Sequence, residues 1–155
     1  MQLRSLWLGK NKIESLTGVS ALVNLRQLDV QNNRLTAIGD ELLNLTNLEE
    51  LYLACNAIEN VSGLPALSPL HTVDLSNNQL NSIDGLDAHT HLEEVWMTKS
   101  LLSSYDALTP LTRLPKLSCI YLEHSPIAKD FEYRMKLTAM IPTLEQLDAT
   151  LITRR

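Results

Sequence analysis

Aromatic residues are scarce in this sequence: they number seven of 155, with a single phenylalanine. Cysteine occurs twice, which is too few for the disulfide framework of a small secreted domain. The formal net charge is −5, so the basic footprint of a nucleic-acid-binding protein is absent. No apolar run approaches the roughly 20 residues of a membrane span, and the N-terminus lacks the apolar stretch of a signal peptide. We therefore expect an intracellular chain with no nucleic-acid or membrane partner.

Motifs of the common catalytic and metal sites are also missing. The sequence contains no G-x-S-x-G, no glycine-rich phosphate loop and no H-E-x-x-H. Its four histidines join no cysteine or carboxylate in a metal-ligand spacing. Asp74 and Glu94 could pair as glycosidase carboxylates do, but an open sheet face lacks the water-excluding cleft that raises a carboxylate pKa. We expect no enzyme activity, no catalytic residue, no metal and no cofactor.

Leucine is present in excess, at 32 of the 155 residues. The leucines follow the pattern L-x-x-L-x-L-x-x-N-x-L, whose six copies start at positions 3, 25, 48, 70, 92 and 117. This spacing and pattern are those of the leucine-rich repeat. The sequence predicts an α/β solenoid, a right-handed superhelix with a concave parallel β-sheet. Because the period leaves little room for long helices, we expect short helical or 3-10 segments on the convex side. The repeats occupy residues 1–127.

Several positions in the repeat have a predicted structural role. The asparagine in each copy should satisfy buried backbone groups between neighbouring coils, because its amide can both donate and accept. Serine replaces it at Ser100 and Ser125, and the shorter side chain should weaken this bonding. Three glycines share one repeat position and predict a tight turn on the outer side. His89 stands where other copies have leucine, so we interpret it as a partly exposed or hydrogen-bonded core histidine rather than a ligand.

The C-terminal segment, 128–155, departs from the repeat. Apolar spacing predicts a helix over 130–141 with Asp130 as its N-cap, and a strand-like rhythm resumes after Pro142. A solenoid must cover its last apolar layer, so we interpret this segment as a cap. No such unit precedes the first repeat. We therefore expect the C-terminal half of a longer protein, or an N-terminal end covered by another molecule. We expect a monomer unless this end self-associates.

Stacking the repeats aligns equivalent residues about 4.8 Å apart along the concave sheet. The middle outward position forms a row that holds both tryptophans, two tyrosines and two aspartates. An inert solvent face would explain scattered polar residues but not this aromatic stripe. Tryptophan and tyrosine are enriched at binding hot spots, and carboxylates steer a basic partner. We predict that the concave face binds a protein through Trp7, Asp29, Glu50, Tyr52, Asp74, Glu94, Trp96, Tyr121 and Glu123.

Several segments resemble the leucine-rich-repeat regulatory subunits of protein phosphatase 1, the regulatory subunit 7 family. They are LGKNKI at 8–13, VWM at 95–97, LLSSY at 101–105, YLEHSPI at 121–127 and IPTLEQLDAT at 141–150. The resemblance implies a noncatalytic scaffold of nucleus and cytoplasm that acts around mitosis. Its concave face would bind the phosphatase catalytic subunit, with a further inhibitor subunit as an additional partner. The family's contact positions fall here on Trp7, Asp74, Glu94, Trp96 and Tyr121.

This chain departs from the family pattern in two ways. Ser100 and Ser125 replace the repeat asparagine, and about half of the family's repeats and its acidic N-terminal stretch are absent. Two other interpretations therefore stay open. One is a leucine-rich-repeat adaptor for a different protein, of the spliceosomal or axonemal type. The other is a truncated solenoid without independent binding.

Overall fold

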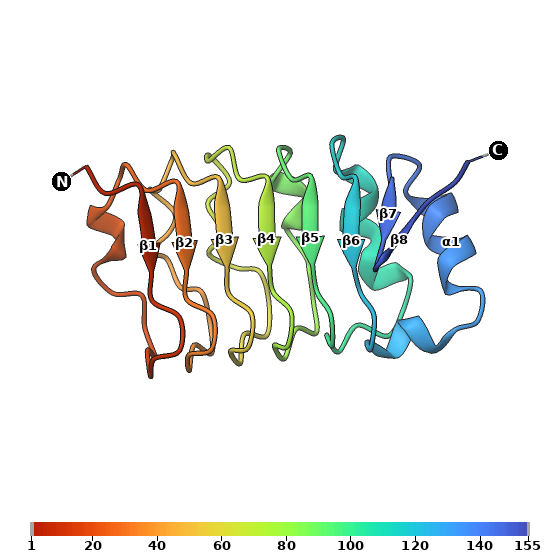
Figure 1. Cartoon of the computed structure of the whole chain (residues 1–155), viewed down its shortest axis with the longest axis horizontal. Helices are drawn as coiled ribbons and strands as arrows, with labels where there is room; N and C mark the ends of the chain where they lie inside the picture. The colour runs from red at the N-terminus through yellow and green to blue at the C-terminus, as the bar shows by residue number, and fades with distance from the viewer. Residues whose placement is uncertain (1, 155) are drawn as a thin grey trace.

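The computed structural model describes residues 2–154 and has the shape of a short, curved solenoid (Figure 1). Within that range one eight-stranded sheet runs in sequence order from β1 to β8. Neighbouring strands are parallel up to β7, and β7 pairs with β8 in antiparallel fashion. The strands are β1 (Ser5–Trp7), β2 (Gln27–Asp29), β3 (Glu50–Tyr52), β4 (Thr72–Asp74), β5 (Glu94–Trp96), β6 (Cys119–Tyr121), β7 (Gln146–Leu147) and β8 (Thr150–Leu151).

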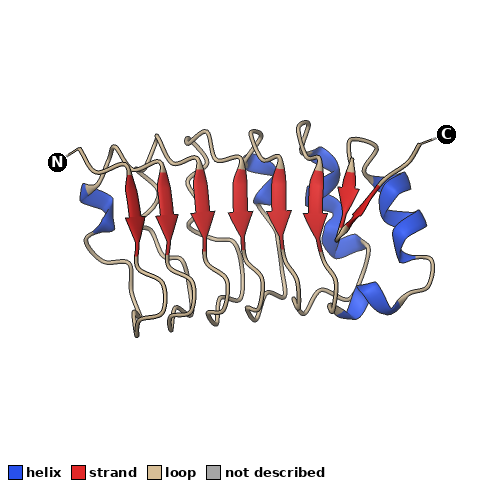
Figure 2. Cartoon of the chain, viewed as in Figure 1, coloured by secondary structure: helices blue, strands red, loops and turns tan. Residues whose placement is uncertain are grey.

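Short helices occupy the side of the coils away from the sheet and the C-terminal end (Figure 2). This confirms the leucine-rich-repeat fold that the sequence predicts. No described helix is long and apolar enough to cross a membrane. The helical segments are the 3-10 helices η1 (Val19–Ala21), η2 (Leu86–Ala88), η3 (Asp106–Arg113) and η4 (Pro126–Lys129), and the α-helix α1 (Tyr133–Met140).

The outer turns depend on glycine, as expected. Gly18 and Gly85 directly precede η1 and η2 with φ angles of 95° and 89°, a left-handed conformation that costs glycine little. Gly63 has φ of 97°, and a Cβ atom there would lie 1.9 Å from the carbonyl oxygen of Gly39 in the preceding coil. Glycine at position 63 therefore permits both the turn and the close approach of two coils.

The predicted role of the repeat asparagine is confirmed. The Asn78 Nδ2 atom donates to the Leu53 carbonyl of the preceding coil at 3.0 Å and to the Leu75 carbonyl of its own coil at 2.9 Å. Its Oδ1 atom accepts a bond from the Ile58 backbone N–H at 3.0 Å. One side chain thus satisfies three backbone groups in two coils. Asn33 and Asn56 make the same bonds, and we call these three residues the asparagine ladder.

The serine substitutions change the ladder in the last coils. The Ser125 Oγ atom accepts a bond from the Ser100 backbone N–H at 3.0 Å and lies 2.9 Å from the Ser100 Oγ atom. It also reaches the Met97 carbonyl at 3.4 Å, a longer contact than those of the asparagines. The two serines therefore bond mainly to one another. The serine side chain is shorter than that of asparagine and cannot reach the backbone groups of both coils.

A left-handed residue precedes the ladder position in every coil, a feature that the repeat pattern did not predict. These residues have φ angles between 53° and 62° although none is glycine. Left-handed backbone costs an ordinary L-residue about 1–2 kcal/mol, and tertiary structure overrides that cost here. They are Lys10, Asn32, Cys55, Asn77, Lys99 and His124, with Asp148 at the corresponding point of the cap.

The cap contains the expected helix, but the expected N-cap is wrong. Helix α1 begins at Tyr133, and no side chain caps its N-terminus. The Asp130 carboxylate instead accepts bonds from the Glu132 backbone N–H at 3.0 Å, the Tyr105 hydroxyl at 2.7 Å and the Lys136 ammonium at 2.7 Å. The Lys136 hydrogen bond lowers the pKa of Asp130 to about 2. Asp130 therefore joins the cap to the preceding coil.

His89 lies in the core, as expected, but it is buried rather than partly exposed, with 7 % of its surface exposed. Its Nδ1 atom is buried and has no hydrogen-bond partner among the described residues. Burial lowers the pKa of His89, and the nearby Asp87 carboxylate only partly opposes this. The folded chain therefore holds His89 in its neutral form more strongly than the unfolded chain does.

Replacing Asn78 with alanine should lower the free energy of unfolding by about 2–4 kcal/mol, because three buried backbone groups lose their partners. Asn11→Ala is the matched control, since Asn11 is exposed and bonds only to carbonyls of its own coil. Its loss should stay below about 1 kcal/mol. Urea unfolding followed by circular dichroism measures both, and equal losses would contradict the inter-coil role of the ladder.

Stability should fall as the pH drops from 7 to 5, because the unfolded chain protonates His89 near its ordinary pKa while the folded chain resists protonation. His89→Leu, which restores the residue of other repeats, should flatten this dependence. The exposed His91→Gln should leave the slope as in the parent chain. Urea midpoints at pH 7 and pH 5 provide the measurement, and a wild-type slope in His89→Leu would show that another group is responsible.

Candidate functional site

Strand pairing places the last residues of β1 to β6 in one row across the concave sheet. Trp7 pairs with Asp29, which pairs with Tyr52. The row continues through Asp74 to Trp96 and then Tyr121. This is the register that the repeat spacing predicts, because each coil contributes the same strand position. The nine predicted contact residues therefore lie on three adjacent rows of one face, but their environments differ.

Tyr52, Trp96 and Tyr121 form an aromatic cluster on this face. The Trp96 ring centroid lies 6.4 Å from that of Tyr52 and 6.0 Å from that of Tyr121, the latter in an edge-to-face arrangement. Such pairs are favourable beyond the area they bury. Tyr52 and Trp96 are two strands apart, a spacing of about 9.6 Å at the backbone. Their rings therefore lean toward each other above the intervening strand.

Asp74 occupies that intervening position and is buried, with 8 % of its surface exposed. Asp74 was predicted as a contact residue of the concave face, but it is buried because an aspartate is short and its two neighbours in the row are large. The carboxylate accepts a bond from the Ser76 backbone N–H at 2.9 Å. Burial raises the pKa of Asp74 in spite of this bond. Asp74 thus lies beneath the aromatic rings rather than at the surface.

A hollow of about 240 Å³ opens beside the aromatic cluster, lined by Ser76, Trp96, Thr98 and Tyr121. The Nε1 atom of Trp96 is buried and has no acceptor among the described residues. A buried N–H without an acceptor carries a desolvation cost that most native groups avoid. The Trp96 N–H therefore carries this cost in the described structure.

Glu50 lies at the other side of the cluster and is held in place by two donors. The Tyr52 hydroxyl donates to its carboxylate at 2.5 Å and the Gln27 amide at 2.8 Å. The Tyr52 bond is the main reason that the pKa of Glu50 is lowered. Glu50 is therefore ionised at neutral pH and fixes the orientation of the Tyr52 ring.

Trp7 and Asp29 form a separate patch at the N-terminal end of the face. Trp7 is 62 % exposed, and neither ring contact of the cluster involves it. The Asp29 carboxylate accepts bonds from the backbone and the side-chain amide of Gln31, at 2.9 and 3.1 Å. The predicted stripe is thus divided into the Trp7 patch and the aromatic cluster.

The cap extends the face by one strand, which the sequence interpretation omitted. The Gln146 amide in β7 donates to the Tyr121 hydroxyl at 2.8 Å. A second hollow of about 290 Å³ lies between the cluster and the cap, lined in part by Glu94, Glu145 and Gln146. The L-x-x-L spacing at 144–147 indicates this extra strand in the sequence, because the same spacing precedes each earlier strand. Glu123 follows β6, and its backbone N–H donates to Asp148 at 2.9 Å.

The two cysteines are unpaired. Cys55 is exposed, whereas Cys119 is buried and faces Glu94 and Asp148, so that burial and these charges raise its pKa to about 11. Among residues 2–154, no group of three or more histidine, cysteine or acidic side chains is arranged to hold a metal ion.

Comparison with known proteins shows similarity to leucine-rich-repeat proteins. The family model described as Leucine Rich repeats (2 copies) matches residues 2–43 and 23–66. Protein phosphatase 1 regulatory subunit pprA of Dictyostelium discoideum is 39 % identical over 75 residues, 48 % of this chain and 22 % of that protein. Human protein phosphatase 1 regulatory subunit 7 is 43 % identical over 52 residues, 34 % of this chain and 14 % of that protein. The chain thus spans about a fifth or less of these relatives.

Solved structures extend the similarity to nearly the whole chain. A chain of the Drosophila melanogaster SNF/U2A′ complex matches with a TM-score of 0.77 and 26 % identity, over 98 % of this chain and 87 % of that one. A leucine-rich-repeat protein of Leptospira interrogans matches with a TM-score of 0.79 over 93 % of this chain and 36 % of its own, and at 23 % identity it shows the fold alone. The chain is thus a leucine-rich-repeat solenoid whose sequence resembles, over a third to a half of its length, regulatory subunits of protein phosphatase 1.

Proposed function

We propose that this chain is a noncatalytic scaffold that binds the catalytic subunit of protein phosphatase 1 through its concave face. The observation that carries the proposal is the aromatic cluster of Tyr52, Trp96 and Tyr121, in a chain whose curated relatives are regulatory subunits of that phosphatase. Here three of the seven aromatic residues lie together on an open sheet, where they serve as anchors for a partner.

The charges of the face support a basic partner surface. Glu50, Glu94 and Glu123 flank the cluster, and Glu50 is fixed by its bonds to Tyr52 and Gln27. Carboxylates at the rim of an interface increase the association rate and set the register more than they add affinity. The aromatic rings therefore supply most of the affinity, and the carboxylates orient the incoming protein.

We extend the proposal to the remaining features of the family. The chain acts in the nucleus and cytoplasm, and a further inhibitor subunit can join the complex. Asp74 supports the rings from below, so we assign it a positioning role and not a direct contact. The Trp7 patch is a second, weaker point of contact, because a lone exposed ring lacks the surrounding residues that exclude water from a hot spot.

A second candidate is a complex of the type that U2A′ forms with SNF. The match to that structure covers nearly the whole chain at 26 % identity, which is more of the chain than any single curated relative reported above. A complex of this type would also form on the concave face and use the aromatic cluster. The two candidates therefore differ in the identity of the partner, and purified partners distinguish them.

Trp96→Ala and Tyr121→Ala should each weaken binding of the purified phosphatase catalytic subunit by about 30-fold, which corresponds to about 2 kcal/mol. Each removes a ring that is part of the cluster and leaves the buried leucines untouched. Isothermal titration calorimetry measures the dissociation constant, and circular dichroism confirms that each variant stays folded.

Phe131→Ala is the matched control, because it removes a ring that is 96 % exposed on the cap, outside the concave row. Its dissociation constant should equal that of the parent chain. Unchanged binding by the Trp96→Ala, Tyr121→Ala double variant would exclude the concave face. Binding of SNF but not of the phosphatase by the parent chain would favour the second candidate.

A further inference from the structure

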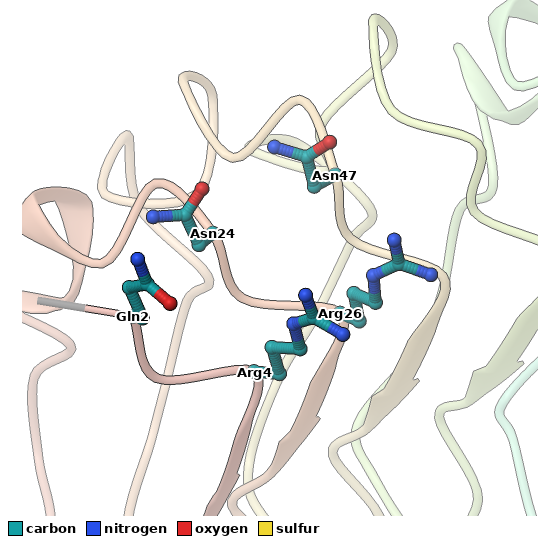
Figure 3. A pocket seen from close by; sticks show the side chains of 5 residues that line it. All are labelled: Gln2, Arg4, Asn24, Arg26 and Asn47. Carbon is teal, nitrogen blue, oxygen red and sulfur yellow. The ribbon is translucent and has the colours of Figure 1, made fainter.

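A basic hollow lies away from the concave row, where the chain approaches its first two strands. It has a volume of about 230 Å³ and is lined by Gln2, Arg4, Asn24, Arg26 and Asn47. Arg4 is the residue before β1 and Arg26 is the residue before β2. Figure 3 shows the two arginine side chains extended in the same direction, with the side-chain amides of Asn24 and Asn47 on the loops above them. The lining is thus made entirely of side chains that can donate hydrogen bonds.

The backbone fixes the two arginines close together. The Arg26 backbone N–H donates to the Arg4 carbonyl at 2.8 Å, so their strands are adjacent and about 4.8 Å apart. Like charges on neighbouring strands repel one another. Only Arg26 has an acidic partner, Glu49, at 3.1 Å. Arg4 has neither an ion pair nor a side-chain hydrogen bond among the described residues. One positive charge in the hollow is therefore uncompensated, in a chain whose net charge is −5.

The basic character is confined to the first two coils. The same backbone position continues along this edge as Glu49, His71, Glu93, Ser118 and Glu145, which are linked by successive backbone bonds. Three of these five residues are acidic. The residues at this backbone position are thus basic in the first two coils and mostly acidic in the later ones. This change of charge favours an anion site at the first two coils.

We propose that the basic hollow binds a dianionic oxyanion of the phosphate monoester class, carried by a phosphorylated serine or threonine of a partner protein. Each guanidinium group presents a planar fork that can donate two parallel bonds to such a group. Two forks on adjacent strands match a dianion better than a single carboxylate, which fills one fork. Binding also relieves the repulsion between Arg4 and Arg26. The site is independent of the concave face and of the phosphatase proposed to bind there.

Nuclear magnetic resonance of the ¹⁵N-labelled chain tests the site directly through its arginine Nε–H signals. Titration with inorganic phosphate or O-phosphoserine at constant ionic strength should shift the Arg4 and Arg26 signals in a saturable manner. Acetate should bind at least tenfold more weakly, because it carries one charge. Arg4→Gln should abolish the saturable shift. Glu49→Gln should tighten binding about two- to fivefold, because it frees Arg26 from its exposed ion pair.

Arg113 provides the matched control, since it is an exposed arginine with one acidic partner, Asp87, at 3.0 Å on the convex side. Arg113→Gln should bind phosphate like the parent chain. Equal shifts at Arg113 and at the two hollow arginines, or parental binding by Arg4→Gln, would overturn the site. Equal binding of acetate and phosphate would overturn the dianion assignment. Binding of inorganic phosphate but not of O-phosphoserine would overturn the assignment to a phosphorylated side chain.

Discussion

The solenoid depends on a bond between a side-chain amide and the backbone of the neighbouring coil. A strand of three residues pairs with the strands beside it, but the chain then turns away and leaves buried carbonyl and N–H groups without strand partners. Asn33, Asn56 and Asn78 supply those partners, each bonding to its own coil and to the coil before it. Since coils contact only their nearest neighbours, the regularity of this bond helps to keep β1 to β4 in the same register. The row of concave side chains is a consequence of that register.

Structural features that recur in every coil were predictable from the sequence. Features that depend on the particular side chains beside one residue were not. Leucine spacing predicts the strands, their order and the alignment of Trp96 with Tyr121, because all of these follow from a period. The burial of Asp74 depends on the two large rings beside it, which a period does not describe. The N-cap role of Asp130 was wrong because helix α1 begins only at Tyr133, and the contacts of the Asp130 carboxylate with Tyr105 and Lys136 do not follow from the apolar spacing. The bond from Gln146 to Tyr121 likewise joins the cap to the last repeat.

Charge divides the molecule into surfaces of different character. The concave rows contain five carboxylates and no lysine or arginine, while the first two coils carry Arg4 and Arg26 at the edge of the same sheet. The two surfaces attract opposite charges. A partner with a basic patch and an acidic or phosphorylated segment beside it therefore has one favourable orientation. Electrostatic complementarity of this kind selects orientation more strongly than it adds affinity.

The reversed direction of β8 has a mechanical consequence. Arg134 in α1 donates to the carbonyls of Leu147, Thr150 and Leu151, so the helix cross-links both strands of the final hairpin. Because a single side chain ties the helix to two strands that run in opposite directions, neither strand of the hairpin can separate from the sheet without also breaking its bonds to α1. The C-terminal coil should therefore open as one unit and not strand by strand.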